Sequence, residues 1–293
     1  MLQFVLILPQ IFREPAFVHI AIIGHISRDI TTNGYTLGGA VSYAGITARR
    51  LGAEVTVLTR AHPKDAQHLK NEGINVINLP TDVYTTFRND YHHGHRTQRL
   101  LAVAAPILAS EAPAELYQAD ILLLAPVAQE VDPAIASQAT HMLAASPQGW
   151  MREWDVQGRV SATPWYSSGR ILPYLDAIFF SDADIAGDTS ILSPIINTVP
   201  LSVITKAIKG CVLYHRGSLH IIPPRPVHKE VDATGAGDTF SAAFLVELHN
   251  GLRPDDAAYF ANVTASMAIE GLGATTIPDR EQVQSYIRAH PRL

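Results

Sequence analysis

The chain has 293 residues, which is enough for one large α/β domain or two smaller domains with a substantial core. Apolar residues make up 47% and charged residues 17% of it, a composition that excludes an intrinsically disordered protein. The formal net charge of −5, without a dense basic cluster, argues against nucleic acid as the main partner.

The cysteine content and the N-terminal sequence bear on the compartment. The single cysteine, Cys211, excludes an intramolecular disulfide and indicates a reducing environment. The apolar run Leu2–Leu8 is too short to span a bilayer and lacks the basic start and the cleavage site of a signal peptide. We therefore expect a cytoplasmic protein without a membrane partner, in which residues 1–17 form a leader or an extra strand.

Strand and helix patterns alternate along the first third of the chain. Val18–Gly24 is a continuous apolar run that ends at a glycine, which predicts a strand buried on both faces. His25–Asp29 is predicted to be a polar loop at the carboxyl end of that strand, where α/β sheets bind their ligands. The predicted elements that follow are a helix from Gly38-Gly39 to Arg50, a strand at Val55–Thr59, a helix at Pro63–Asn71 and a strand at Val76–Leu79. This alternation predicts parallel β-α-β units.

The middle and the second half of the chain contain further strands. Residues 83–103 alternate between polar and apolar side chains on both sides of a histidine-rich turn, which predicts a two-stranded hairpin. Further predicted strands are Asp120–Pro126, Ala177–Phe180, Leu201–Thr205 and Cys211–Tyr214, and predicted helices are Pro133–Ala145, Thr239–His249 and Pro254 to about Glu270. Residues 156–170 carry no pattern that assigns them.

The stretch Val231–Phe240 joins a glycine pair to the start of a helix. Gly235 and Gly237 flank an alanine, Asp238 follows, and the apolar spacing of the helix begins directly after it. Amides at a helix N-terminus have no intrahelical acceptor, and together with the positive end of the helix dipole they attract an anion. Glycine also lets the main chain approach phosphate oxygens closely. These residues therefore predict a phosphate site.

Asp238 is unusual in such a site because a carboxylate repels a bound phosphate. It is useful there if it takes a proton from an attacking hydroxyl group. The helix terminus is expected to keep it ionised, as a base must be. The alternative is that Asp238 only caps the helix, a position that aspartate favours.

The sequence Asp-Ala-Thr-Gly-Ala-Gly-Asp-Thr-Phe at 232–240 resembles the C-terminal signature of the ribokinase-like (PfkB) carbohydrate kinase family. The resemblance implies that Asp238 is the catalytic base and that Gly235, Ala236 and Gly237 form an anion hole for the transferring phosphoryl group. It also implies ATP with Mg²⁺ as the phosphate donor. Ala233 stands where the family usually has threonine.

The same resemblance assigns the acceptor side of the site. Gly24 to Asp29 matches a turn in which the family's carboxylate holds substrate hydroxyls, which implies this role for Asp29. Gly38 and Gly39, with Ser42 beside them, resemble the family's N-terminal signature and would bind the substrate at a second helix N-terminus. Tyr43 or Ala44 occupies the position of the family's usual asparagine, which leaves the acceptor open.

The resemblance also implies residues for the nucleotide and for metal ions. The implied ATP contacts are Thr205, Gly210, Gly235, Gly237 and Asn262, with Ala207 in the place of a further glycine. Ser181 and Asp184 have the spacing of the family's Asn-x-x-Glu and would hold Mg²⁺ through water. Asp232 and Thr234 would help to hold a monovalent cation such as K⁺.

The fold that the resemblance implies is a three-layer α/β/α sandwich with a central, mostly parallel sheet, built by residues 1–293 as one domain. Residues at about 30–37 and 83–105 would form a small β lid over the substrate. The exposed edges of that lid would allow a homodimer to form through it.

The expected activity is ATP-dependent transfer of the γ-phosphoryl group to a hydroxyl of a sugar or polyol. The alternatives are a nucleoside or inositol-type kinase of the same fold, or a non-catalytic nucleotide- or metabolite-binding protein. The first predicted strand is not followed by Gly-x-Gly-x-x-Gly, and the chain has no Gly-x-x-x-x-Gly-Lys-Ser/Thr. These absences argue against a dinucleotide-dependent oxidoreductase and a P-loop kinase.

Overall fold

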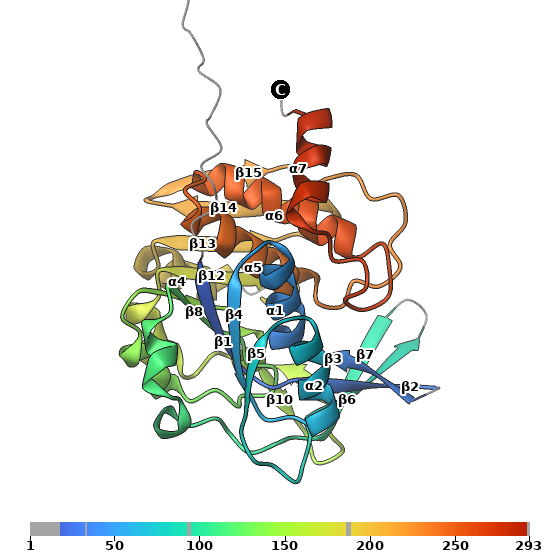
Figure 1. Cartoon of the computed structure of the whole chain (residues 1–293). Coiled ribbons are helices and arrows are strands. Elements are labelled where there is room, and N and C mark those ends of the chain that lie inside the picture. Colours follow the sequence, from blue (N-terminus) through green and yellow to red (C-terminus); the bar gives the residue numbers. More distant parts are fainter. Residues whose placement is uncertain (1–17, 33, 93–94, 186–188, 292–293) are drawn as a thin grey trace, which may run out of the picture.

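The computed structural model describes residues 18–32, 34–92, 95–185 and 189–291. Its centre is a nine-stranded sheet (Figure 1). In spatial order the strands are β15 (Ser218–Ile222), β14 (Cys211–His215), β13 (Leu201–Thr205), β12 (Ala177–Ser181), β9 (Met142–Ala145), β8 (Ile121–Leu124), β1 (His19–Ile23), β4 (Glu54–Thr59) and β5 (Asn75–Asn78). All neighbours from β13 to β5 pair in parallel, and β14 and β15 add an antiparallel edge.

The central strands are buried on both faces, as their continuous apolar runs predict. In β1 the side chains of Ile20 and Ile22 belong to one hydrophobic cluster, whereas Ala21 and Ile23 belong to a second cluster on the opposite face. This division follows from the two-residue period of a strand. The sheet therefore separates two cores, each of which needs a covering layer.

The two layers differ in composition. The first core is covered by α1 (Ala40–Arg50), α2 (Pro63–Asn71), α5 (Ala236–His249), α6 (Pro254–Ala268) and α7 (Arg280–Ala289). The second core is covered by the short helices α3 (Ser168–Ile171) and α4 (Leu192–Thr198) and by short 3₁₀ segments that include Ala114–Gln118, Pro133–Gln138, Pro147–Met151 and Leu172–Tyr174. The result is the expected three-layer α/β/α sandwich.

The predicted helix Pro133–Ala145 is wrong. Pro133–Gln138 is a 3₁₀ segment whose start is capped by Asp132, and Met142–Ala145 is strand β9. The helix-favouring sequence Met-Leu-Ala-Ala lies between β8 and β12, where it completes the parallel sheet. Tertiary pairing thus overrides local helix propensity here.

A second, smaller sheet extends from one side of the main body (Figure 1). It consists of β3 (Gly34–Gly38), β2 (Ser27–Thr31), β6 (Thr86–His92) and β7 (His95–Ala102), in that order. The β6–β7 pair confirms the predicted hairpin. The prediction of a loop at His25–Asp29 is wrong for its second half, because residues from Ser27 onward pair with both β3 and β6. We call this sheet the small sheet.

The unassigned region 156–170 contains β11 (Val160–Ala162), which pairs in antiparallel fashion with β10 (Arg152–Trp154) just before that region. Residues 1–17, predicted to be a leader or an extra strand, lie outside the described residues. Among the helices in the described part of the chain, none is both long and apolar enough to cross a membrane.

Candidate active site

The glycine stretch forms the start of α5. Gly235 precedes the helix with φ +76°, a left-handed conformation that glycine adopts without strain, and its carbonyl accepts a hydrogen bond from the Thr239 amide at 2.8 Å. A Cβ atom at Gly235 would lie 2.1 Å from Cγ of Tyr43. By contrast, a Cβ atom at Gly237 would have no neighbour within 4 Å. Of the predicted anion-hole amides, that of Ala236 donates to the Ala233 carbonyl at 3.3 Å.

Asp238 lies in the first turn of α5 and is partly buried. Burial raises the pKa of its carboxyl to about 7; the positive charge of Arg152 acts against this shift, and the nearby Asp184 carboxylate adds to it. The sequence predicts that the helix terminus keeps Asp238 ionised, whereas the raised pKa points the other way, because burial favours the protonated carboxyl. A carboxyl with a pKa near neutrality is well matched to accepting a proton.

Ser181 and Asp184 form a tight turn after β12. One carboxylate oxygen of Asp184 accepts hydrogen bonds from the Ser181 amide and hydroxyl, both at 2.8 Å, and the other accepts one from Gln148 Nε2 at 2.8 Å. The turn stands at the carboxyl end of β12, beside the end of β13. Within the described residues, no group of three or more His, Cys, Asp or Glu side chains is arranged to bind a metal ion by itself.

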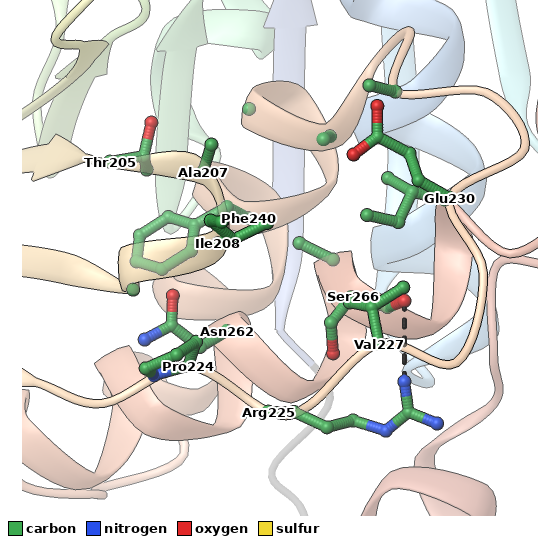
Figure 2. Close-up of a pocket in the computed structure, with 16 residues that line it drawn as sticks. Thr205, Ala207, Ile208, Pro224, Arg225, Val227, Glu230, Phe240, Asn262 and Ser266 are labelled. Carbon is green, nitrogen blue, oxygen red and sulfur yellow. Dashed lines mark hydrogen bonds between the residues drawn. The ribbon is translucent and has the colours of Figure 1, made fainter.

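A pocket opens beside the start of α5 (Figure 2). Much of its lining is apolar. The lining residues are Thr205, Ala207, Ile208, Gly210, Pro224, Arg225, Val227, Glu230, Ala233, Ala236, Gly237, Phe240, Asn262, Ala265, Ser266 and Ile269. Figure 2 shows Thr205, Ala207 and Asn262 on one side of the pocket and Glu230 on the other.

Four of the five predicted nucleotide residues line this pocket, and the fifth, Gly235, does not. Gly210 has φ +82°, and a Cβ atom there would lie 2.2 Å from the Ile222 carbonyl oxygen. Ala207 has φ +47°, an unusual conformation for alanine, at the position where the family has a glycine. Asn262 is buried, and its amide nitrogen donates to the Pro223 carbonyl at 3.0 Å. Asn262 therefore fixes the loop that forms one wall of the pocket.

The predicted acceptor residues meet at the junction of the small sheet and α1. Gly39 has φ +92°, and a Cβ atom there would lie 2.3 Å from the His25 carbonyl oxygen. A Cβ atom at Gly38 would lie 2.4 Å from Oδ2 of Asp29. The other carboxylate oxygen of Asp29 accepts a hydrogen bond from Asn89 Nδ2 at 3.3 Å, and Asn89 Oδ1 accepts one from Gln98 Nε2 at 3.0 Å. Asp29, Asn89 and Gln98 thus form a hydrogen-bonded row across β2, β6 and β7.

Ser42 does not share this open position. Its side chain is buried, and its hydroxyl donates to the Gly38 carbonyl at 2.8 Å. Its amide also donates to the Gly39 carbonyl at 3.0 Å. These bonds indicate that Ser42 holds the glycine turn in place.

Asp232 connects the glycine stretch to the loop after α6. One of its carboxylate oxygens accepts the Thr234 amide and the other accepts the Gly273 amide, each at 3.0 Å. A carboxylate has lone pairs for about four hydrogen bonds or ligands. The Asp232 carboxylate therefore retains lone pairs that can bind a singly charged cation.

Comparison with known protein families identifies the family of the chain. Residues 27–280 match the model of the pfkB family of carbohydrate kinases. The chain belongs to this family.

The proteins that resemble this chain carry names that indicate different substrates. An inositol 3-kinase from Arabidopsis thaliana is 26% identical over 269 residues, which cover 87% of this chain and 74% of that protein. A ribokinase from Bacillus subtilis is 40% identical over 85 residues, 29% of each chain. Among solved structures, a pyrophosphate-dependent kinase of the ribokinase family, complexed with a pyrophosphate analogue and myo-inositol, superposes with a TM-score of 0.77 and 22% identity, covering 92% of this chain and all of that one.

Sequence reasoning did not single out four residues that lie beside the predicted ones. Asn89 and Gln98 lie in a hairpin that was predicted only as strands, and Arg152 lies in a segment that follows no clear pattern. Tyr43 was noted only as a departure from the family's asparagine, yet its ring packs on Gly235 and so brings the start of α1 against the start of α5. The alternation of polar and apolar residues along the hairpin was the one signal that could have indicated Asn89.

Proposed function

We propose that this protein is an ATP-dependent kinase that phosphorylates a hydroxyl group of a small polyhydroxylated acceptor, with Asp238 as the general base. The observation that carries the proposal is the position of Asp238. A carboxyl with a pKa of about 7 stands in the first turn of α5. Ala236 and Gly237 of the same turn line the apolar pocket, and Gly235 before it lies against Tyr43 of α1. Asp238 would take the proton of the acceptor hydroxyl as its oxygen attacks the γ-phosphorus, while the bond to the ADP oxygen breaks.

The anion hole would act on the phosphoryl group as it transfers. First-turn amides of α5, foremost that of Gly237, would donate to its oxygens, and the helix dipole would add a fixed positive potential. The open space around Gly237 supports this role, since a phosphate oxygen can approach the backbone there. Arg152 would place a further positive charge near the reacting atoms, as its effect on the Asp238 pKa indicates.

The pocket favours a nucleotide as donor. Apolar side chains such as Ile208, Val227 and Ile269 suit the flat face of a base, and Glu230 can accept hydrogen bonds from ribose hydroxyls. Pyrophosphate has no part that would use such a lining, and the Glu230 carboxylate would repel it.

The row of Asp29, Asn89 and Gln98 favours an acceptor with several hydroxyl groups. Each of these side chains can bind a hydroxyl, and Gly38 and Gly39 allow the ring or chain of the acceptor to lie on bare backbone. A cyclitol of the inositol type is our first candidate because the relative that aligns over most of this chain is an inositol 3-kinase. Sugars and open polyols fit the same chemistry.

The proposed metal residues fit their ions. Mg²⁺ keeps most of its waters and binds through phosphates and one or two carboxylates, and Asp184 would hold it through water. When bound, the ion neutralises charge on the donor phosphates. Asp232 and Thr234 would hold a monovalent cation under the anion hole. We also infer a homodimer through the small sheet, which a measurement of the molecular mass in solution would test.

The test is a coupled assay of the purified chain with Mg²⁺ and K⁺ against inositols, sugars, polyols and nucleosides, with ATP or pyrophosphate as donor. We expect turnover with ATP and with at least one polyhydroxylated acceptor. Turnover of nucleosides alone would contradict the proposed class of acceptor. Turnover with pyrophosphate alone would contradict ATP as the donor. ATP binding without turnover on any acceptor would favour a non-catalytic binding protein.

We expect Ile208→Asp to raise the KM for ATP by about tenfold or more, because a charge would face the base on one wall of the pocket. Ile208 is 72% exposed, so the substitution should not disturb folding. Ile221→Asp is the matched control, because Ile221 is 74% exposed but lies on the edge strand β15 and does not line the pocket. Steady-state kinetics at saturating acceptor measure both. Equal KM values for the two variants would place the nucleotide elsewhere.

A further inference from the structure

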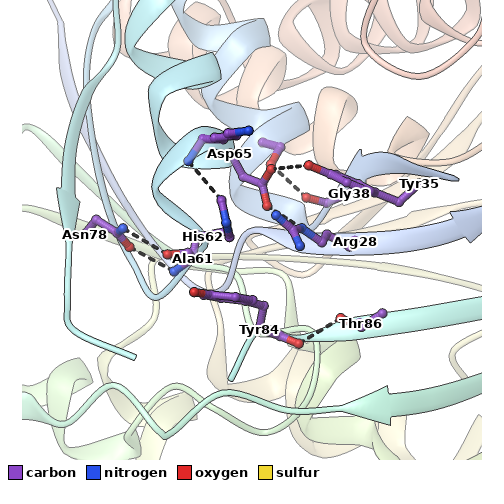
Figure 3. Close-up of polar contacts among 11 residues, drawn as sticks. Arg28, Tyr35, Gly38, Ala61, His62, Asp65, Asn78, Tyr84 and Thr86 are labelled. Atoms are coloured by element: carbon purple, nitrogen blue, oxygen red, sulfur yellow. Dashed lines mark hydrogen bonds and ion pairs between the residues drawn. The ribbon is translucent and has the colours of Figure 1, made fainter. Parts of the chain in front are cut away.

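A buried carboxylate of the main body accepts hydrogen bonds from one face of the small sheet. Asp65, in the first turn of α2, is 5% exposed, and an aspartate this buried is usually paired. One oxygen accepts a hydrogen bond from Arg28 Nε at 2.6 Å, and the other accepts one from the Tyr35 hydroxyl at 2.8 Å (Figure 3). The two donors come from β2 and β3, so that a single carboxylate joins α2 to two strands of the small sheet.

The contacts continue from this carboxylate to the third strand. The guanidinium carbon of Arg28 lies 4.3 Å from the centre of the Tyr35 ring and 5.2 Å from that of Tyr84, which precedes β6. The ring of His62, the N-cap residue of α2, meets Tyr84 edge-on at 5.0 Å. The hydrogen bond to Asp65 raises the pKa of Tyr35, so its hydroxyl stays protonated and keeps donating.

The strand period connects this cluster to the acceptor site. Arg28 precedes Asp29 in β2, and Tyr35 precedes Thr36, the residue paired with Asp29 in β3. Successive side chains of a strand point to opposite faces of a sheet. Fixing Arg28 and Tyr35 on the face that contacts Asp65 therefore fixes Asp29 on the opposite face. There Asp29 stands against Gly38 and accepts from Asn89.

We propose that Asp65 is a positioning residue for the acceptor: it anchors β2 and β3 to α2 and thereby sets where Asp29 stands relative to the Gly38-Gly39 turn. The inference rests on the proposed function, because it assigns the acceptor to Asp29. Asp65 itself does not touch the acceptor or the phosphates. Its loss should therefore weaken use of the acceptor and leave ATP binding unchanged.

The experiment compares Asp65→Asn with Glu247→Gln. Glu247 is also 5% exposed and pairs with an arginine, Arg280, but it lies on α5 against α7, away from the small sheet. We expect Asp65→Asn to lower kcat/KM for the acceptor about tenfold and to leave the KM for ATP unchanged. The expected loss is below the roughly 100-fold fall in rate that misplacing a reacting group by about 1 Å can cause. Glu247→Gln should change neither constant. Tyr35→Phe, which removes one of the two hydrogen bonds, should give an intermediate loss.

Hydrogen–deuterium exchange gives a readout that does not depend on activity. Peptides covering residues 27–38 should exchange faster in Asp65→Asn than in the wild type and remain unchanged in Glu247→Gln. Faster exchange in a protein without kinase activity would contradict the proposed function and leave the anchor standing. Unchanged exchange, or an equal rise of the KM values for acceptor and ATP, would overturn the positioning role.

Discussion

Replacement of Asp238 by asparagine is expected to lower kcat by about 100-fold to 10,000-fold, the range of a lost general base. Asparagine has nearly the same shape as aspartate but cannot take a proton from the acceptor hydroxyl. ATP should still bind, because the pocket and the first-turn amides of α5 are unchanged. Single-turnover kinetics and a direct nucleotide-binding measurement separate the two effects.

The pH dependence gives the same prediction a second test. With a pKa of about 7, Asp238 is protonated at acidic pH, so wild-type kcat/KM should rise with pH up to about 7 and then level off. Because the unfolded chain gives up this proton near the ordinary value of 3.8 and the fold only at about 7, the fold loses stability as pH rises from about 4 to about 7 and loses no more above that. Relative to its effect at about pH 4, Asp238→Asn should accordingly raise the Tm increasingly as pH rises, and the gain should level off above about pH 7.

The control for this variant is Asp182→Asn, which removes an exposed carboxylate beside the end of β12. It should retain wild-type kinetics and an unchanged pH profile. Retention of full activity by Asp238→Asn would exclude the base and leave Asp238 as a helix cap.

Gly235→Ala is expected to destabilise the protein by at least about 2 kcal/mol, because it combines a left-handed backbone with a steric clash. The new methyl group would overlap the ring of Tyr43, which is buried. Thermal unfolding should show the loss directly. Adding Tyr43→Ala should recover part of the Tm, since it removes the clash but not the backbone strain.

Gly237→Ala separates the anion hole from the fold. A methyl group at residue 237 meets no atom within 4 Å, so the Tm should stay near that of the wild type. The same methyl group would occupy the space through which a phosphate oxygen approaches the amide, and kcat should fall. Wild-type activity in Gly237→Ala would remove this residue from the anion hole.

Much of the fold follows from local patterns. The buried parallel strands are continuous apolar runs between glycine and polar loops, and α1, α2, α5 and α6 start at glycine or proline signals that the structure confirms. The second layer does not follow in this way. Its 3₁₀ segments lack the long 3.6-residue period of the first layer, and β9 is defined by its neighbours β8 and β12.

The candidate site shows the same difference between local features and contacts of distant segments. Gly235, Gly237 and Asp238 are neighbours in sequence, so their shared position could be predicted. Contacts between distant segments could not. Asp65 gives no local sign that it binds Arg28 and Tyr35, and the contact of Tyr43 with Gly235 requires α1 and α5 to pack together. The positive φ of Ala207 is likewise visible only in three dimensions.

The contact between Tyr43 and Gly235 also constrains how this sequence can change over generations. A side chain at residue 235 is accepted only if residue 43 has already become smaller, and a ring at residue 43 requires glycine at residue 235. We therefore expect the two positions to vary together, although one lies near the start of the chain and the other near its end. A lineage that replaces the aromatic ring frees residue 235 from the steric restriction, but the backbone at φ +76° still favours glycine.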